Sequence, residues 1–420
     1  MELTRNGRKR VVITGLGVVS PLGNKDEFWD AITAGKSGIR QLQNIDTAHL
    51  NVKIGGEIRD FDSSDTIPPK QARRMGRATQ FAIVAAVMAV NDAGMTVEAV
   101  GEIGSRVATL IGTTLGSYEV GESGIKAWRD SGYKRANPMS IVNALPNMPG
   151  HYVSKMLKAV GPLVTPSVAC ATGIQAVGEA SDLIQLGKCD LAIAGAVDAV
   201  MFDYILAGFS ATRALTRDFN DAPEQASRPF DANRTGFVLG EGGAVFIVES
   251  LERAIERGAK VYAEILGYGA SSDAYHVAAP DPNGGGAKRA MQWALDDAKT
   301  APSEVEYINA HGSSTQANDA IETAAVKHVF GEDAYHIPVS STKSMIGHAM
   351  AGCGSLEISA CLMSLERELL HPTVNYDTPD PACDLDYVPN EARPVPGIRT
   401  IMSNSFGLGG QNASIILRKI

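Results

Sequence analysis

The sequence predicts an α/β protein in which strands and helices alternate along the chain. Segments rich in β-branched residues recur between segments with helical periodicity, a pattern typical of α/β layers. Of the 420 residues, 43 are glycine and only 6% are aromatic, which favours tight turns and close approaches of the backbone. A glycine-rich turn leads into an apolar strand both at 236–248 and at 405–417. This internal similarity suggests that the chain contains two copies of one structural unit.

In the first half of the chain, residues 11–19 form the first predicted strand. A signal peptide is the alternative for this start, but the apolar run is short, contains glycine and lacks a convincing cleavage site. After this strand we expect further strands at 106–112, 163–169, 190–196 and 243–249, a helix at about 172–186 and an amphipathic helix ending at Arg257.

The second half repeats this alternation. We expect helices at about 286–298, 319–329 and 352–368, and strands at 305–310, 338–341, 399–403 and 413–418. We divide the chain near residue 255, into an N-terminal half over 1–255 and a C-terminal half over 256–420. No linker rich in proline, serine or charge separates the halves, so we expect one compact body.

Charge and cysteine content exclude several function classes. A formal net charge of -9 argues against nucleic acid as an electrostatic partner. No segment reaches the ~20 apolar residues that a membrane span requires. The five cysteines are odd in number and form no CxxC pair or zinc spacing. This usage predicts a reducing compartment, the cytoplasm, with neither a disulfide framework nor a bound metal.

Cys170 lies where the sequence predicts a strand, a tight turn and a helix in succession. A thiol at a helix N-terminus faces the positive end of the helix dipole and unpaired backbone N–H groups, and both favour the nucleophilic thiolate. The same N–H groups can hold a developing oxyanion. A lone cysteine after a buried strand is usually only a small buried hydrophobe, so motifs further along the chain must decide between these interpretations.

Four features of the second half bear on that decision. His311 directly follows a predicted strand, and Lys343 and His348 lie five residues apart in a turn. A glycine-rich loop covers residues 406–410, and Glu357 stands alone among apolar helix residues. The loop lacks the G-x-G-x-x-G spacing of dinucleotide sites and leads into a strand rather than a helix.

Together these side chains fit one reaction. A cysteine hydrolase needs one histidine and an orienting Asn or Asp, and two histidines with a lysine exceed that need. Neutral imidazoles that donate N–H to a thioester oxygen would stabilise an enolate, whose carbon could attack an acyl group held on the thiol. The set therefore favours a decarboxylating Claisen condensation.

At these residues the chain resembles the β-ketoacyl-[acyl-carrier-protein] synthases of the type II elongating class, members of the thiolase superfamily. The similarity extends from Val11–Gly17 to Asn404–Gly407. It implies a thiolase-like five-layer α-β-α-β-α fold built from two pseudo-repeated βαβαβαββ halves, usually as a homodimer. It also implies an acyltransferase of fatty acid biosynthesis, which condenses a Cys170-bound acyl group with malonyl-carrier protein and releases 3-oxoacyl-carrier protein, CO2 and free carrier protein.

The resemblance also assigns roles to individual residues. Cys170 would take the acyl chain, and His311 and His348 would hold the malonyl thioester, with Lys343 positioning them and Glu357 supporting Lys343. The oxyanion hole would come from the backbone N–H groups of Cys170 and Leu408. The resemblance places further residues around this centre: Ser313 and Thr315 on the phosphopantetheine arm, Asp273, His276 and Phe406 in bordering loops, and Leu115, Phe209 and Leu408 along the acyl pocket.

An acidic carrier protein would need a local basic patch on this acidic chain. Lys70, Arg73, Arg74 and Arg77 have the spacing of one helix face, which without the resemblance would indicate only a solvated face. Lys134, Arg135 and Arg213 match other basic positions that the family uses. The resemblance implies no resident cofactor, since phosphopantetheine arrives on the carrier protein.

Two residues depart from the family pattern. Leu408 replaces a phenylalanine that gates the acyl pocket, and Ser313 replaces a common threonine while keeping the hydroxyl. The runner-up function is a discrete polyketide or specialised-lipid ketosynthase, which shares the catalytic residues. A non-catalytic chain-length partner would lack Cys170, and a degradative thiolase would carry a second cysteine in the 406–410 loop.

Overall fold

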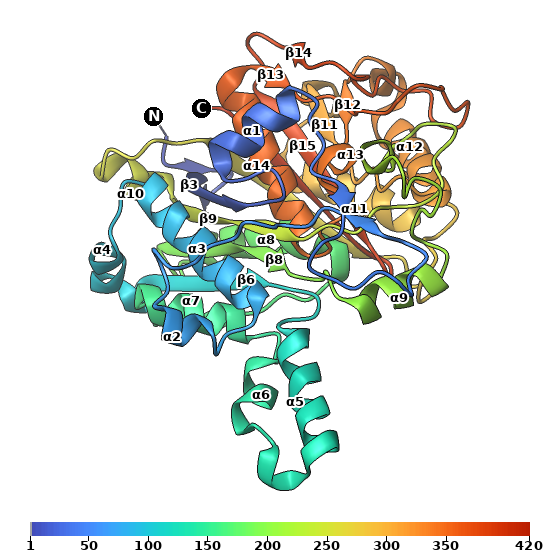
Figure 1. The fold of residues 1–420 in the computed structure, drawn as a ribbon. Coiled ribbons are helices and arrows are strands. Elements are labelled where there is room, and N and C mark those ends of the chain that lie inside the picture. Colours follow the sequence, from blue (N-terminus) through green and yellow to red (C-terminus); the bar gives the residue numbers. More distant parts are fainter. Residues whose placement is uncertain (1) are drawn as a thin grey trace.

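The structure, a computed structural model, describes residues 2–420 and is built around a ten-stranded mixed sheet (Figure 1). The strands of its first half are β3 (Val11–Val19), β6 (Val107–Gly112), β7 (Leu163–Val164), β8 (Leu191–Asp198) and β9 (Gly242–Ser250). Those of its second half are β10 (Ala263–Ser272), β11 (Tyr307–Asn309), β12 (Val339–Ser340), β15 (Thr400–Gly407) and β16 (Gln411–Arg418). Short pairs lie outside it: β1 (Thr4–Arg5) with β2 (Arg8–Lys9), β4 (Arg40–Gln41) with β5 (Ile54–Gly55), and β13 (Leu369–Leu370) with β14 (Arg393–Pro394).

The helices fall into the same two halves. The first half contains α1 (Lys25–Thr33), α2 (Pro69–Ala72), α3 (Arg77–Asp92), α4 (Val97–Glu102), α5 (Tyr118–Ser131), α6 (Pro138–Asn143), α7 (Met148–Leu157), α8 (Thr172–Gln185), α9 (Asp203–Ala211) and α10 (Leu251–Glu256). The second half contains α11 (Gly285–Ala298), α12 (Gln316–Phe330), α13 (Lys343–Ile346) and α14 (Gly352–Arg367).

The strand order confirms the internal repeat. The first half runs β3-β9-β8-β6-β7 across the sheet, and the second runs β10-β16-β15-β11-β12. Numbered within its own half, each follows the order first, fifth, fourth, second, third. The two first strands, β3 and β10, pair antiparallel and join the halves. The two glycine-rich turns noted in the sequence lead into β9 and β16, which occupy equivalent positions in the two half-sheets.

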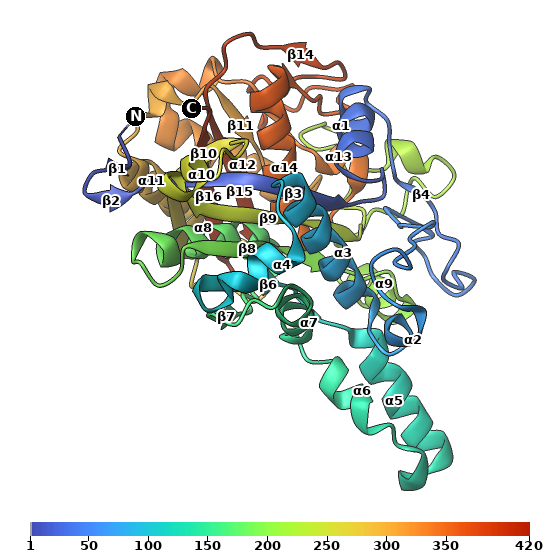
Figure 2. The same cartoon turned by 90° about the vertical axis from the view of Figure 1, so that its left-hand side faces the viewer.

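Helices separate the two half-sheets and cover their outer faces (Figures 1 and 2). On the first half α3 and α7 form the outer layer, and on the second half α11 does so with α12 packed beside it. Between the half-sheets, α8 and α14 pack against each other and against strands of both halves. The layers are therefore α-β-α-β-α, as the family resemblance implies. A Cβ at Gly173 would lie 2.4 Å from the Ser355 nitrogen, so glycine permits the close approach of the central helices.

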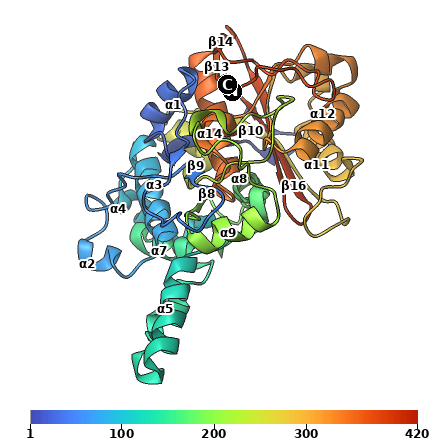
Figure 3. The same cartoon turned by 45° about the vertical axis from the view of Figure 1, so that its right-hand side comes forward.

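A helical arm was not anticipated from the sequence. Helices α5 and α6 project together from the body between β6 and β7 (Figures 1 and 2). None of the residues of α5 is buried, although Ile125 and Trp128 are large and apolar. Where the arm leaves the body it lies near α9 (Figure 3), and the rings of Tyr118 and Tyr204 stack with centroids 6.0 Å apart.

Two local predictions were wrong. The strand expected at 163–169 covers only Leu163–Val164, because the chain leaves the sheet and turns at Ala169, whose φ is 49°. The helix expected to carry Lys70 to Arg77 on one face ends at Ala72, and α3 begins separately at Arg77. Arg77 turns inward to the buried Glu241 carboxylate at 3.0 Å instead of joining an exposed stripe.

Across residues 2–420, every helix is too short or too polar to cross a membrane.

Candidate active site

Cys170 occupies the turn between β7 and the central helix α8. It lies in a short 3-10 helix, Ala169–Ala171, that runs directly into α8. The Thr172 hydroxyl holds this turn: it accepts the Val168 N–H at 2.9 Å and donates to the Ala169 carbonyl at 2.6 Å. The sulfur therefore sits at the N-terminal end of α8, as the sequence predicts, and the residue is only 3% exposed.

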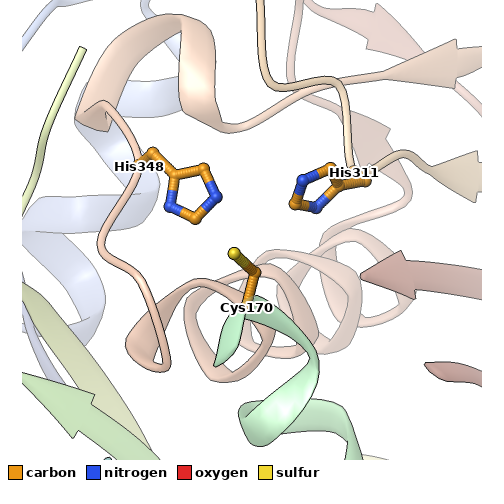
Figure 4. Close-up of side chains that lie close together, drawn as sticks. All are labelled: Cys170, His311 and His348. Atoms are coloured by element: carbon orange, nitrogen blue, oxygen red, sulfur yellow. The ribbon is translucent and has the colours of Figure 1, made fainter. Parts of the chain in front are cut away.

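Two imidazoles from the other half of the chain converge on this sulfur. A donor atom of His311, one of His348 and the Cys170 sulfur all lie within 4.8 Å of one another. Figure 4 shows the sulfur pointing between the two rings. The ring centroids are 5.4 Å apart at an interplanar angle of 77°. The convergence that the sequence analysis requires is thus present.

His311 is held from both its backbone and its ring. It follows β11, and its backbone N–H and that of Gly312 each donate at 2.8 Å to the Glu322 carboxylate on α12. Lys343 donates at 2.6 Å to the His311 carbonyl and lies 3.4 Å from its ring Nδ1. Sequence reasoning missed Glu322, whose only signal was an acidic residue inside the helix that follows the motif.

His348 lies between the short helix α13 and the central helix α14. Gly347, with a φ of 71°, ends α13 and turns the chain, and the His348 N–H donates to the Val238 carbonyl at 2.7 Å. On the ring, Nδ1 accepts the Met350 N–H at 3.0 Å. This bond orients the opposite nitrogen, Nε2, away from the protein backbone.

Lys343 and Glu357 form a buried ion pair behind the two histidines. The ammonium of Lys343 contacts one oxygen of Glu357, and both residues are at most 1% exposed. The other Glu357 oxygen accepts the Ser405 hydroxyl at 3.1 Å. Burial alone would lower the pKa of Lys343, but the Glu357 carboxylate reverses this and holds that pKa above its ordinary value. The lysine is therefore charged.

The hydrogen bonds assign both imidazoles as neutral N–H donors toward the cavity. An ammonium can only donate, so Nδ1 of His311 accepts from Lys343 and its proton resides on Nε2. His348 has the same tautomer because its Nδ1 accepts the Met350 N–H. Burial and the nearby Lys343 charge lower the pKa of His311 well below its ordinary value and that of His348 to about 3. The pair suits a developing oxyanion better than a metal ion, which binds the unprotonated ring nitrogen.

The protonation of Cys170 differs from the sequence expectation. Burial raises the pKa of the thiol to about 11, although the backbone N–H groups of Leu408 and Cys170 and the charge of Lys343 lower it. The helix terminus and the loop do favour the thiolate, but desolvation of the closed site outweighs them. The thiol form therefore prevails near neutral pH.

A cavity of about 320 Å³ connects this centre to the surface. Its wall contains Ser313 and Thr315, whose hydroxyl oxygens are 3.0 Å apart, and Leu408 is 42% exposed at the loop that borders it. Asp273 also lines the cavity, where its carboxylate accepts the Asn412 amide at 2.8 Å and joins the loop after β10 to the start of β16. Phe406 faces His311, with ring centroids 6.0 Å apart.

Besides the ion pair behind the histidines, three residues predicted to line or border the pocket lie outside the cavity wall. Leu115 and Phe209 pack against an apolar cluster that includes the wall residues Phe237 and Met350, so they lie one layer behind the wall. Their assignment to an acyl pocket stays a prediction. His276 is exposed and supports the wall indirectly, because its Nδ1 accepts the N–H groups of Ala278 and Ala279 at 3.1 Å. Phe237 and Met350 carried no motif that sequence reasoning could detect.

The structure separates the predicted docking residues into three places. Lys70, Arg73 and Arg74 are exposed on and after α2, and Arg213 is exposed beside the cavity residue Ala214. Lys134 and Arg135 lie in the turn between α5 and α6, which is the tip of the arm (Figure 1). Within one chain these groups do not form a single patch.

Comparisons with known proteins cover nearly the whole chain. Residues 8–254 match the family described as beta-ketoacyl synthase, N-terminal domain, and residues 262–377 match its C-terminal domain. A 3-oxoacyl-[acyl-carrier-protein] synthase 2 of Staphylococcus aureus is 45% identical over 412 residues, which is 98% of each chain.

Solved structures also match over 98% of this chain. A beta-ketoacyl synthase from Burkholderia phymatum superposes with a TM-score of 0.91 at 36% identity, covering 98% of this chain and 99% of the other. A type II polyketide ketosynthase, solved in complex with its acyl-carrier protein, superposes with a TM-score of 0.90 at 34% identity over 98% of this chain and 100% of the other.

Proposed function

Because this chain belongs to the beta-ketoacyl synthase family, we propose that it elongates acyl chains in fatty acid biosynthesis. It is an acyltransferase that condenses an enzyme-bound acyl group with a malonyl thioester. The observation that carries the proposal is the convergence of one buried sulfur with two imidazole nitrogens within 4.8 Å, backed by a buried ammonium. Each group has a part in one of three steps.

In the first step we assign the thiol of Cys170 as the acceptor of the acyl group. Its sulfur attacks the thioester carbonyl of the acyl-carrier protein, and the thiol proton leaves with the phosphopantetheine sulfur. The carbonyl oxygen becomes an oxyanion, for which the N–H groups of Cys170 and Leu408 are placed beside the sulfur. A thiol pKa of about 11 keeps the nucleophile protonated near neutral pH, so the thiol proton must be given up as the sulfur attacks.

In the second step His311 and His348 hold the malonyl thioester. Their Nε2–H groups donate to the thioester carbonyl, so that loss of CO2 leaves an enolate stabilised by two hydrogen bonds. Lys343 fixes the ring of His311, and Glu357 keeps the ammonium charged and in place. Because both imidazoles are neutral donors, neither needs to gain or lose a proton in this step.

In the third step the enolate carbon attacks the acyl group on Cys170. A carbon–carbon bond forms, the Cys170 thioester breaks, and the product is 3-oxoacyl-carrier protein. The Cys170 sulfur leaves as a thiolate and takes up a proton from water that enters the emptied cavity. Ser313 and Thr315 are assigned to the phosphopantetheine arm, because their hydroxyls line the route from the surface to the sulfur.

The function is tested by supplying the purified chain with an acyl-carrier protein and malonyl-carrier protein. We expect 3-oxoacyl-carrier protein and CO2 in equal amounts. Absence of the 3-oxoacyl product with acyl groups of every length offered would contradict the proposal.

A polyketide or specialised-lipid ketosynthase is the second candidate. It is supported by the similarity to a type II polyketide ketosynthase and by Leu408, an aliphatic side chain at the loop bordering the cavity. The 45% identity to a 3-oxoacyl-[acyl-carrier-protein] synthase exceeds the 34% identity to the polyketide enzyme and favours fatty acid elongation. The longest product released with excess malonyl-carrier protein separates the two, since a polyketide enzyme would add further units to an unreduced 3-oxoacyl chain.

We propose an acyl carrier protein as the partner, bound through the basic residues after α2. Reversing the charges of exposed Arg73 and Arg74 to Glu should raise KM for carrier-linked substrates by about tenfold, because two favourable interfacial charges become repulsive. The increase should shrink at high salt. Lys188→Glu, at an exposed lysine outside the predicted set, is the matched control. Equal KM values for the double variant and this control would show that Arg73 and Arg74 form only a solvated surface.

We also propose a homodimer, formed through the arm and the exposed edge of β7. The arm exposes Trp128 (51%), Tyr133 (86%) and Ile141 (69%), and apolar surface of this kind marks interaction sites. Strand β7 ends the sheet with unpaired backbone groups, which favour pairing with another chain. Light scattering should give twice the 44.3 kDa chain mass, and Trp128→Glu with Ile141→Glu should lower it. A monomeric wild type would contradict the proposal.

We place the reaction in the cytoplasm, which suits the five cysteines, all of them free thiols. We infer no resident cofactor or metal, since the thiol, the imidazoles and the carrier-borne phosphopantetheine supply every group that the three steps use.

A further inference from the structure

A second buried thiol touches the ring of His348. Cys353 is the second residue of α14 and has no exposed surface. Its sulfur lies 3.4 Å from Nδ1 of His348, the nitrogen that faces away from the cavity. The three proposed steps make no use of this thiol, and no sequence motif singles it out.

The hydrogen-bond pattern fixes the direction of this contact. The sulfur of Cys353 already accepts the backbone N–H of Ala349 at 3.0 Å. Burial raises the pKa of Cys353 well above its ordinary value, so the sulfur keeps its proton. The S–H can therefore donate to Nδ1 of His348, which also accepts the Met350 N–H at 3.0 Å.

We propose that Cys353 is a positioning residue that holds His348 in its Nε2–H form for malonyl decarboxylation. The inference rests on the proposed function, in which His348 donates from Nε2 to the thioester oxygen. Two donors aimed at Nδ1 disfavour a proton there and leave Nε2 as the protonated nitrogen. Donation to Nδ1 also polarises the ring, because hydrogen bonds in a chain strengthen one another.

The titratable neighbours of Cys353 are engaged with other groups, so the acceptor available to its S–H is Nδ1 of His348. The titratable groups facing the thiol and the ring come from four elements: Lys343 on α13, Glu357 on α14, Cys170 in the turn before α8, and His311 after β11. Of these, Lys343 is engaged by Glu357 and His311. Asp198 on β8 anchors the same turn separately, because its carboxylate accepts the Ala351 N–H at 2.8 Å.

Replacing the thiol tests this assignment. Cys353→Ala should lower kcat for malonyl-carrier decarboxylation about three- to tenfold with KM unchanged, because the ring loses one of its two donors and samples the wrong tautomer. Cys353→Ser restores a donor of similar size and should recover at least half of the loss. Cys189→Ala removes another buried thiol, outside the cavity wall, and should keep the wild-type rate.

The second readout is the tautomer itself, measured by NMR on protein labelled with ¹⁵N-histidine in the absence of substrate. We expect wild type and Cys353→Ser to carry the His348 proton on Nε2, and Cys353→Ala to show a partial shift to Nδ1 and a higher His348 pKa. Identical rate and tautomer in wild type and Cys353→Ala would overturn the inference. A wild type that never decarboxylates the malonyl substrate would instead defeat the proposed function, and the tautomer measurement would still decide the role of Cys353.

Discussion

Replacing Cys170 with glutamine should lower condensation by about a thousandfold or more, while malonyl decarboxylation continues. The thiol is the only atom of the site that we assign to carry the acyl group, so its loss removes the first and third steps. The donors for the second step, His311 and His348, come from other segments and are untouched. The glutamine amide oxygen can occupy the place of an acyl carbonyl beside the N–H groups of residues 170 and 408. The measurement is CO2 release together with 3-oxoacyl product from carrier-linked substrates.

A second substitution in the same background controls this result. His311→Ala added to Cys170→Gln should lower the remaining decarboxylation by about 10²–10³, the usual effect of removing one oxyanion donor. If Cys170→Gln alone stopped both CO2 release and condensation, the separate roles of thiol and imidazoles would be wrong.

Removing one partner of the Lys343–Glu357 pair should be costly to both stability and activity. Glu357→Leu leaves a buried ammonium without a counter-charge, and we expect the free energy of unfolding to fall by about 3–5 kcal/mol. Condensation should fall as well, because Lys343 no longer holds the ring of His311. Denaturant unfolding and the product assay measure the two effects separately.

The double variant Lys343→Met with Glu357→Leu distinguishes charge burial from chemistry. Replacing a buried ion pair by apolar side chains of similar volume is often neutral or stabilising, so most of the lost stability should return. Activity should not return, because the donor to His311 is absent. A Glu357→Leu variant as stable as the wild type would show that the ammonium is not confined beside residue 357.

The repeated fold could be predicted from the sequence because both halves bury equivalent strands in the same order. Each half places a mostly buried strand between two others, and such strands appear in the sequence as apolar runs after a glycine-rich turn, as at β9 and β16. The arm formed by α5 and α6 has no comparable apolar pattern in the sequence. No residue of α5 is buried, and Ile125 and Trp128 remain half exposed, so their pattern could not indicate a packing partner in the body.

The centre of the site was predictable, and its surroundings were not. Cys170, His311 and His348 each follow a predicted strand or turn, where functional residues of α/β proteins commonly lie. The strands before them stand at opposite ends of the sheet, and the packing of the two halves brings the side chains together. The protonation of Cys170 depends on how far the closed site is desolvated, which no local pattern reveals. Cys353 appears in the sequence as an ordinary helix residue, and only the path of the chain around His348 brings its sulfur to that ring.

The most direct test asks which residue carries the acyl chain. The purified protein is incubated with an acyl-carrier protein alone, digested, and its peptides are weighed by mass spectrometry. The expected result is one acyl group on the peptide that contains Cys170, and none on the peptides that contain Cys189, Cys353, Cys361 or Cys383. Acylation at any other side chain, or product formation with no acyl group ever bound to the protein, would contradict the account.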